Sequence, residues 1–318
     1  MVGFTVSPLR GQKDFGAVVS GLTPESLDDP ATRKALYDLW IDKGVLVFKG
    51  LTGLDTQLKL SAIFGEPEEH PLLRGVDQKR THHVIADVEY DPEDGDLYEI
   101  GDELRGGYLP WHFDVAYNEK INRGGILRPH ILPKRGGETG FIDQIAAYDW
   151  LPDDLKAEIE GVNVIYAFAT DSTKVKFGEK PDRCVHLSSR MLRAATHPSL
   201  QHRAIHPLVY TQAETGRKVL NVSPWHAVGL EGRENDPEGD ALLRRVIDLS
   251  IRPERAYFHQ WQPEDMVLWD NWRMMHCACG VPDGELRKMG RTNIAGDYSL
   301  GRWENPQAAV GEEQPATM

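Results

Sequence analysis

A chain of 318 residues can hold one large domain or two ordinary ones, and its composition, 40% hydrophobic and 27% charged, is that of a globular protein. Its net charge of −13 argues against nucleic acids and anionic membranes as partners, because both present phosphate groups that would repel it. The N-terminus has no basic segment followed by an apolar one, and no apolar run approaches about eighteen residues. Neither a signal peptide nor a membrane span is therefore expected.

The three cysteines, Cys184, Cys277 and Cys279, are too few for a disulfide framework and suit a reducing cytoplasm, where we expect the protein to act. Cys277 and Cys279 could in principle bind a metal. Soft thiolates favour zinc or copper, however, so we do not expect them to be ligands of an open iron site.

The first part of the chain predicts two helices around a buried strand. Asp29 followed by Pro30 is typical of a helix start, and Gly44 ends that helix. The apolar run at residues 45–48 predicts a buried strand, and residues 55–64 predict a second helix.

Residues 87–103 form the most acidic stretch, with nine carboxylates in seventeen residues. Like charges at this density predict a solvated, mobile loop. Because the stretch comes just before His112, a lid over a site is the alternative interpretation.

His112 and Asp114 are two residues apart, so on a strand both side chains would leave the same face. A third ligand, His276, follows a strand-like segment and the turn-forming pair Asp270–Asn271. Two histidines and one carboxylate on one side of a metal, with open positions opposite, are diagnostic of non-haem Fe(II) oxygenases. The alternative is a surface strand that carries two polar residues.

The remainder of the chain predicts many short strands separated by turns and a few helices. Strands are expected at residues 126–131, 140–142, 162–168, 208–211, 218–222, 257–261, 266–269 and 292–296, and helices after Pro152 and Asp236. Residues 170–201 predict loops and short helices. The pattern indicates a mainly β fold, a sandwich or barrel with helical insertions. Residues 1–303 are expected to form a single domain and residues 304–318 a disordered tail.

His197, His202 and His206 are a rival metal cluster. Pro198 and Pro207 follow two of them, and a residue before proline avoids the helical conformation that would align the side chains. We therefore expect loop and strand residues here.

The sequence resembles the taurine dioxygenase family of Fe(II)/2-oxoglutarate-dependent oxygenases, which includes alkylsulfatase and phenoxyacetate-herbicide dioxygenases. The resemblance extends from about Gly44 to Arg302. The matching segments are 64–67, 70–71, 111–114, 136–139, 206–207, 214–218 and 269–271, with His276, Arg287 and Arg291. It implies a double-stranded β-helix, a jelly-roll-like fold with the metal at its open end.

The resemblance also implies roles for these residues. His112, Asp114 and His276 would bind Fe(II), and Arg287 and Thr139 would bind the distal carboxylate of 2-oxoglutarate. Arg291 would bind either 2-oxoglutarate or the substrate. The implied enzyme hydroxylates a small, anionic substrate with dioxygen and releases succinate and CO2, and hydroxylation can lead to C–O, C–S or C–N cleavage. Because Asp114 is present, halogenation is disfavoured.

For the substrate, the resemblance assigns an anionic group to His70 and Arg291, and Tyr117 and Trp269 to the pocket lining, with core packing as the alternative for each aromatic residue. Two further positions differ from taurine dioxygenase: Tyr108 replaces an asparagine and Phe113 a threonine. Both changes enlarge the apolar lining, so a bulkier organic acid than taurine is expected.

Two other classes of protein compete with this interpretation. A zinc-dependent jelly-roll hydrolase, isomerase or sensor would also use His112, Asp114 and His276, but it does not require Arg287. A non-catalytic interaction protein has no use for so many matched polar residues. A small molecule is the expected partner, and self-association into a homo-oligomer stays open.

Overall fold

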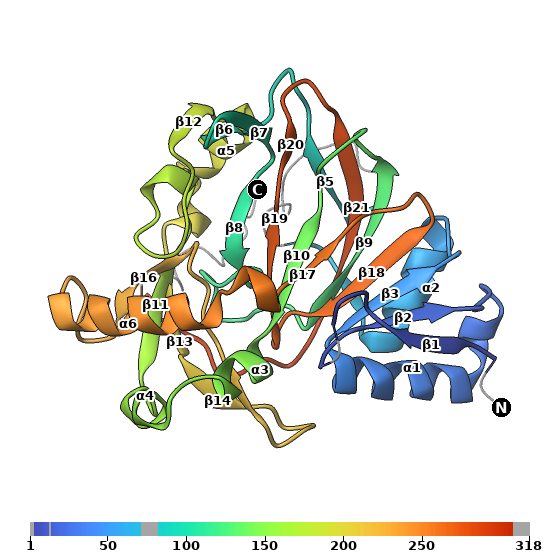
Figure 1. Cartoon of the computed structure of the whole chain (residues 1–318), viewed down its shortest axis with the longest axis horizontal. Helices are drawn as coiled ribbons and strands as arrows, with labels where there is room; N and C mark the ends of the chain where they lie inside the picture. Colours follow the sequence, from blue (N-terminus) through green and yellow to red (C-terminus); the bar gives the residue numbers. More distant parts are fainter. Residues whose placement is uncertain (1–2, 13, 71–81, 308–318) are drawn as a thin grey trace, which may run out of the picture.

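The computed structural model describes residues 3–12, 14–70 and 82–307, and within these ranges it is mostly β-strand with few helices (Figure 1). The helices are α1 (Pro30–Lys43), α2 (Leu54–Phe64), α3 (Gln144–Asp149), α4 (Asp153–Glu158), α5 (Ser189–Ala194) and α6 (Pro237–Ser250). None of the helices in the described ranges is long and apolar enough to cross a membrane.

The largest sheet has eight strands. Their order is β1 (Thr5–Pro8), β2 (Ala17–Ser20), β3 (Val45–Lys49), β18 (Asp265–Asp270), β9 (Gly124–Ile131), β21 (Arg287–Ile294) and β4 (Pro67–Glu68), while β5 (Ile85–Tyr90) also pairs with β21. A four-stranded sheet has the order β17 (Tyr257–His259), β10 (Thr139–Asp143), β19 (Met274–Ala278) and β8 (Leu109–His112). One hydrophobic cluster joins the two sheets: Val47, Val267 and Met289 of the first pack with Phe141 and Met274 of the second.

Three smaller sheets complete the fold. One contains β16 (Ala227–Leu230), β11 (Asn163–Ala167), β13 (Arg203–Pro207) and β22 (Arg302–Trp303), and another contains β12 (Arg183–His186), β6 (Leu97–Ile100), β7 (Glu103–Gly106) and β20 (Val281–Pro282). The third is the hairpin of β14 (Val209–Thr211) and β15 (Lys218–Leu220), which confirms the predicted turn between them.

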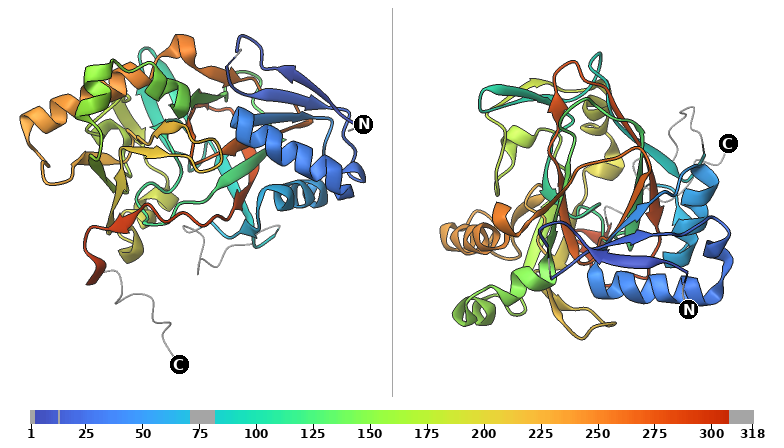
Figure 2. Two further views of the ribbon diagram at one scale, coloured as in Figure 1. Left: turned by 90° about the horizontal axis from the view of Figure 1, so that it is seen from below. Right: turned by 45° about the vertical axis from the view of Figure 1, so that its right-hand side comes forward.

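The predicted helix signals at Asp29 and Asp236 are confirmed. The Asp29 side chain accepts a hydrogen bond from the backbone N–H of Thr32, and Asp236 caps α6 in the same way. Gly44 ends α1 at φ 73°, a conformation that costs glycine little. Helices α1 and α2 pack against the large sheet, whereas α6 covers a separate core at the other end of the molecule (Figure 2).

The prediction of a mobile loop over residues 87–103 is wrong, because this segment contains β5, β6 and the start of β7. Its charges are matched locally. Asp87 and Glu89 pair with Lys288 of the neighbouring β21 at 2.9 and 3.3 Å, and Asp96 accepts from the backbone N–H of Ser188. The alternative interpretation of residues 87–103 as a lid depended on a mobile loop, and these strands do not support it.

Residues 170–201 contain the predicted short helices and, in addition, the strand β12. Of the predicted tail, residues 304–307 lie within the described ranges, where the Glu304 carboxylate pairs with Arg203 at 2.9 Å. Residues 308–318 lie outside the described residues.

Candidate metal centre

His112 and Asp114 are held differently from the prediction that both lie on one strand. Strand β8 ends at His112, and Asp114 lies in the turn that follows, where Val115 has φ 53°. The Asn271 side chain fixes this turn: its oxygen accepts from the backbone N–H of Asp114 at 2.8 Å, and its nitrogen donates to the Asp114 carbonyl at 3.2 Å. The turn-forming segment 270–271 thus positions a residue far away in the sequence.

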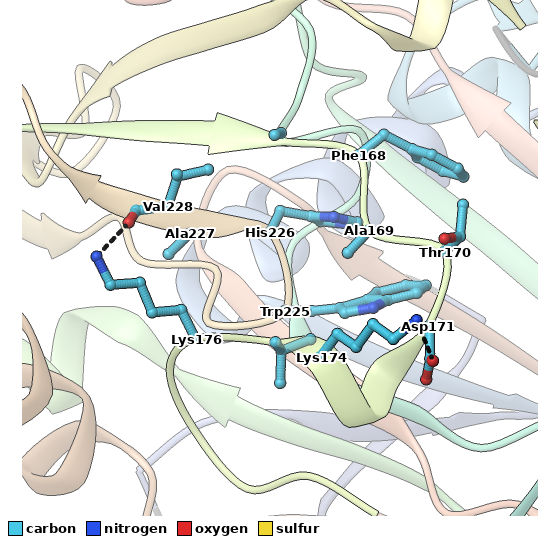
Figure 3. Close-up of a pocket in the computed structure, with 12 residues that line it drawn as sticks. Phe168, Ala169, Thr170, Asp171, Lys174, Lys176, Trp225, His226, Ala227 and Val228 are labelled. Carbon is cyan, nitrogen blue, oxygen red and sulfur yellow. Dashed lines mark hydrogen bonds and ion pairs between the residues drawn. The ribbon is translucent and has the colours of Figure 1, made fainter. Parts of the chain in front are cut away.

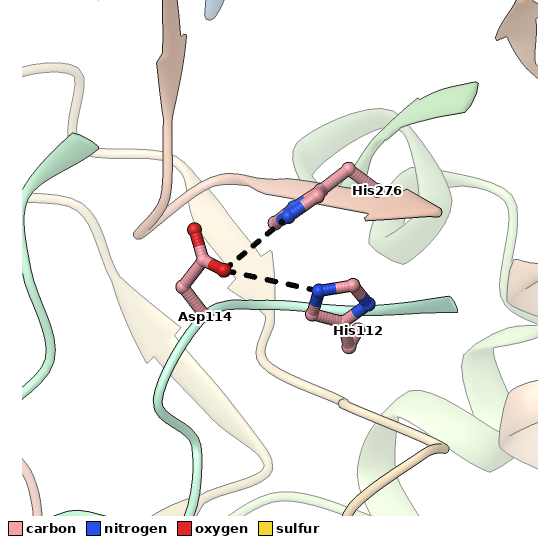
Figure 4. A group of neighbouring side chains, drawn as sticks. All are labelled: His112, Asp114 and His276. Atoms are coloured by element: carbon pink, nitrogen blue, oxygen red, sulfur yellow. Dashed lines mark ion pairs between the residues drawn. The ribbon is translucent and has the colours of Figure 1, made fainter. Parts of the chain in front are cut away.

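His276 comes to the same point from β19, where it is the cross-strand partner of His112. The Oδ1 atom of Asp114 lies 3.5 Å from Nε2 of His276 and 3.8 Å from Nε2 of His112. Dashed lines in Figure 4 mark these two contacts. The three candidate ligand atoms lie within 4.8 Å of one another, and all three residues are buried. This convergence of two imidazoles and one carboxylate fits a divalent cation.

The protonation states suit a metal. Nδ1 of His112 lies 2.6 Å from the carbonyl oxygen of Pro110, which can only accept, so this nitrogen carries the proton and Nε2 presents its lone pair. Burial and the neighbouring His276 hold the pKa of His112 well below its ordinary value. Burial alone would raise the pKa of Asp114, but Arg291 and the two histidines outweigh it and hold that pKa well below its usual range.

Arg291 donates both Nη groups to the Asp114 carboxylate. Its guanidinium carbon also lies 5.3 Å from the centre of the Trp269 ring, and that ring stands 5.2 Å from the ring of His276. Arg291 therefore contacts the candidate ligand Asp114, and the Trp269 ring packs against the candidate ligand His276.

Arg287 is buried at the start of β21, and among the described residues its Nε has no hydrogen-bond partner. Burial lowers its pKa to about 10. The side chain passes over Gly137, where a Cβ atom would lie 3.2 Å from Cδ of Arg287, so this position must stay small. Thr139, two residues further, is also buried. An unmatched buried guanidinium fits a carboxylate ligand.

Two of the predicted substrate residues, Tyr117 and Phe113, are buried among aromatic rings. Tyr117 is buried and packs edge-on against Phe168 and His226. Phe113 packs against Tyr166 and His206, and it belongs to the same hydrophobic cluster as Tyr117. Its place in the pocket lining stays a prediction.

The other two predicted substrate residues, Tyr108 and His70, are both partly buried. Tyr108 directly precedes β8, is partly buried and packs edge-on against Tyr98. His70 is partly buried and is the last residue of its described range.

A cavity of about 300 Å³, which was not predicted, lies between residues 167–176 and 225–228, and none of the three candidate ligands is among its lining residues (Figure 3). Its lining includes Phe168, Lys174, Trp225 and His226. The Trp225 ring lies 5.0 Å from that of His112, and the His226 ring 6.2 Å. Nε1 of Trp225 and Nδ1 of His226 are buried without partners among the described residues. The only sequence signal was the adjacency of Trp225 and His226 after a predicted strand, which is weak.

The rival histidines do not form a metal cluster in the described ranges, where the group of His112, Asp114 and His276 is the candidate that emerges. His206 is buried in β13, where Nδ1 lies 2.9 Å from the Tyr298 hydroxyl and Nε2 lies 2.9 Å from the carbonyl oxygen of Ala116. His197 is exposed and lies within hydrogen-bond distance of Ser199. As expected, His197 and His202 lie outside regular elements and His206 lies in a strand.

Comparison with known proteins gives consistent matches. The family described as "Taurine catabolism dioxygenase TauD, TfdA family" matches residues 5–293. The chain is 33% identical to an (S)-phenoxypropionate/alpha-ketoglutarate-dioxygenase of Sphingobium herbicidovorans, over 92% of this chain and 96% of that protein. It is 27% identical to an alkylsulfatase of Acinetobacter baylyi, over 90% and 84% of the two chains.

Solved structures agree with the fold. A taurine dioxygenase from Burkholderia xenovorans superposes with a TM-score of 0.69 at 23% identity, over 98% of this chain and all of that one. The structure of AAD-2 with Mn(II) and N-oxalylglycine gives a TM-score of 0.69 at 25% identity, over 93% and 99% of the two chains.

Proposed function

We propose, since the chain belongs to the taurine catabolism dioxygenase TauD, TfdA family, that His112, Asp114 and His276 bind the Fe(II) of a 2-oxoglutarate-dependent dioxygenase. The protein is an oxidoreductase of this class, and it uses Fe(II), 2-oxoglutarate and dioxygen. The observation that carries the assignment of these residues is the convergence of both Nε2 atoms on Oδ1 of Asp114 in a buried site. Fe(II) and 2-oxoglutarate, when bound, supply the oxidant that hydroxylates the substrate, with release of succinate and CO2.

Arg287 and Thr139 bind the distal carboxylate of 2-oxoglutarate in this proposal. Support comes from the unpartnered Nε of Arg287 and from the position of both side chains near Gly137, which leaves room for the arginine stem. A guanidinium pairs with a carboxylate through two parallel hydrogen bonds and is therefore specific for that group. A zinc-dependent hydrolase, the alternative class, is not favoured, since the relatives are named as 2-oxoglutarate-dependent enzymes.

The primary substrate is a small organic acid with an aromatic or similarly bulky apolar body. Its body lies in the cavity between Phe168 and Trp225, next to Tyr117, and its anionic group meets Arg291 with help from His70. Arg291 already holds Asp114 with its Nη groups, but its buried Nε has no partner in the described part of the chain and can donate. Relatives named for phenoxypropionate and 2,4-dichlorophenoxyacetate support this substrate class.

The overall architecture in this proposal is one jelly-roll-like domain of residues 1–303, with the metal between the eight-stranded and four-stranded sheets. The described cysteines are all free thiols, which fits a reducing cytoplasm. The net charge of −13 supports a small-molecule partner rather than a nucleic acid.

A substrate screen tests this function. The Fe(II) enzyme is given 2-oxoglutarate and, in turn, aryloxy acids, alkyl sulfates, taurine and the neutral alcohol matching each aryloxy acid, and succinate is measured. The proposal expects the greatest stimulation from an aryloxy acid and little from its neutral alcohol. Equal stimulation by acid and alcohol would refute the anionic substrate, and no Fe(II)-dependent succinate with any of them would refute the proposed site.

A further inference from the structure

The hydroxyl of Thr139 has a hydrogen-bond partner in another side chain. Nε1 of Trp261 donates a hydrogen bond to Oγ1 of Thr139 at 3.1 Å. Trp261 lies two residues beyond β17, and this strand pairs with β10 so that Thr139 is opposite His259. The contact thus links the segment after β17 to Thr139 on β10, the residue that we propose to bind 2-oxoglutarate.

Because Thr139 accepts this hydrogen bond, the proton of its hydroxyl is free to be donated to another group. An indole N–H can only donate, while a hydroxyl has one proton and two lone pairs. Since the Thr139 oxygen accepts from Trp261, its own proton is left to donate elsewhere. In the described part of the chain no acceptor takes that proton, although Thr139 is buried. A buried hydroxyl proton without an acceptor calls for a ligand oxygen or water.

We infer that Trp261 is a positioning residue for 2-oxoglutarate: it orients the Thr139 hydroxyl so that the proton points at the distal carboxylate. This inference rests on the proposed function, in which Thr139 touches that carboxylate. Without Trp261 the hydroxyl can rotate, and its oxygen lone pair can face the carboxylate, which weakens binding. Trp261 acts through Thr139 and not on the ligand.

A buried network holds the indole in place. The Trp261 ring packs edge-on against His259, with ring centres 4.6 Å apart at 90°. Nε2 of His259 lies 3.1 Å from Oδ2 of Asp265, and Nδ1 lies 2.9 Å from the Tyr257 hydroxyl. The other carboxylate oxygen of Asp265 pairs with Lys49 at 2.6 Å. The same contacts would also serve simple core packing, so the test must separate positioning from stability.

A double-mutant cycle makes this separation. The affinity of the Mn(II)-loaded protein for 2-oxoglutarate is measured by calorimetry for wild type, Trp261→Phe, Thr139→Val and the double variant, with melting temperature as the check on folding. Mn(II) supports binding without turnover, so the readout is affinity. Trp303→Phe, on β22 against His202, is the matched control. If Trp261→Phe does not fold, Trp261→Leu replaces it in the cycle.

Thr139→Val should weaken 2-oxoglutarate binding about tenfold or more, because a hydrogen bond to a charged group is lost. Trp261→Phe should weaken it by about fivefold, and the double variant should bind no more than about twofold more weakly than Thr139→Val, since coupled residues are not additive. Thr139→Ser, which keeps the hydroxyl, should retain sensitivity to Trp261→Phe.

Two outcomes overturn the inference in different ways. If Thr139→Val leaves 2-oxoglutarate binding unchanged, the proposed contact of Thr139 fails and the inference fails with it. If Thr139→Val weakens binding but Trp261→Phe either has no effect or weakens it by the same factor in both backgrounds, the proposed function stands and the positioning role is wrong.

Discussion

Arg291 donates both Nη groups to the carboxylate of Asp114, at 3.0 and 2.7 Å. The pair is buried, so each charge depends on the other for compensation. Oδ1 of Asp114 also faces Nε2 of both His112 and His276. The same carboxylate thus connects the candidate metal ligands to the arginine that we propose for the substrate anion.

Arg291→Gln should destabilise the metal-free protein by roughly 3–5 kcal/mol, because it leaves a buried carboxylate without its cation. Excess Mn(II) should restore much of that loss, since the metal then neutralises Asp114. Urea unfolding with and without Mn(II) measures both effects. Lys288→Gln is the control: its pairs with Asp87 and Glu89 are partly exposed, and it should cost less than about 1 kcal/mol. Equal unfolding free energies for Arg291→Gln and wild type without metal would contradict the account.

Arg287→Ala should raise the KM for 2-oxoglutarate strongly, since loss of one partner of a desolvated ion pair typically costs about 2–5 kcal/mol. Arg287→Lys should recover only part of the affinity, because the two-pronged contact of guanidinium with carboxylate is gone. Steady-state kinetics at saturating primary substrate measures this. An unchanged KM in both variants would exclude Arg287 from the co-substrate site.

Phe168→Ala should raise the KM for the primary substrate by about two- to tenfold, as expected for the loss of an aromatic contact worth about 0.5–1.5 kcal/mol. The affinity for 2-oxoglutarate should not change. Phe113→Leu is the contrast, because Phe113 packs in the core against Tyr166 and His206. It should lower stability by about 1 kcal/mol and leave both KM values unchanged. A raised KM for the primary substrate in Phe113→Leu, with an unchanged KM in Phe168→Ala, would contradict this prediction and would support Phe113 as a lining residue of the pocket.

Stability should fall as the pH is lowered from about 6.5 toward 4. Burial lowers the pKa of His206 to about 4, below the value of about 6.5 expected in the unfolded chain. In that window the unfolded chain binds the proton and the folded chain does not, so protonation favours unfolding. His206→Gln should show a smaller loss between pH 7 and pH 5 in urea unfolding. An identical pH slope in the variant would contradict this role of His206.

Local signals in the sequence predicted much of the fold and the centre of the site. Asp29 and Asp236 begin α1 and α6 as expected, because helix caps depend on neighbours within a few residues. The segment from His112 to Asp114 and the position of His276 indicated the candidate ligands, and the structure brings them together.

The features that local signals did not predict depend on partners distant in sequence. Within residues 87–103, β5 pairs with the distant β21, whose Lys288 matches two of its charges, and β6 pairs with β12 as well as with β7. Trp225 and His226 reach the ligands through long-range packing around His112. The ring contacts of Phe113 with Tyr166 and His206 likewise join residues far apart in the sequence.

Metal binding tests the central claim most directly. Titration of the metal-free protein with Mn(II), followed by calorimetry, compares wild type with His112→Ala, Asp114→Ala and His276→Ala. The exposed His197 provides the control variant His197→Ala. The account predicts one Mn(II) per chain for wild type and control, and an affinity lower by at least about 100-fold in each of the three other variants. Wild-type affinity in any one of those three, with the fold intact, would contradict it.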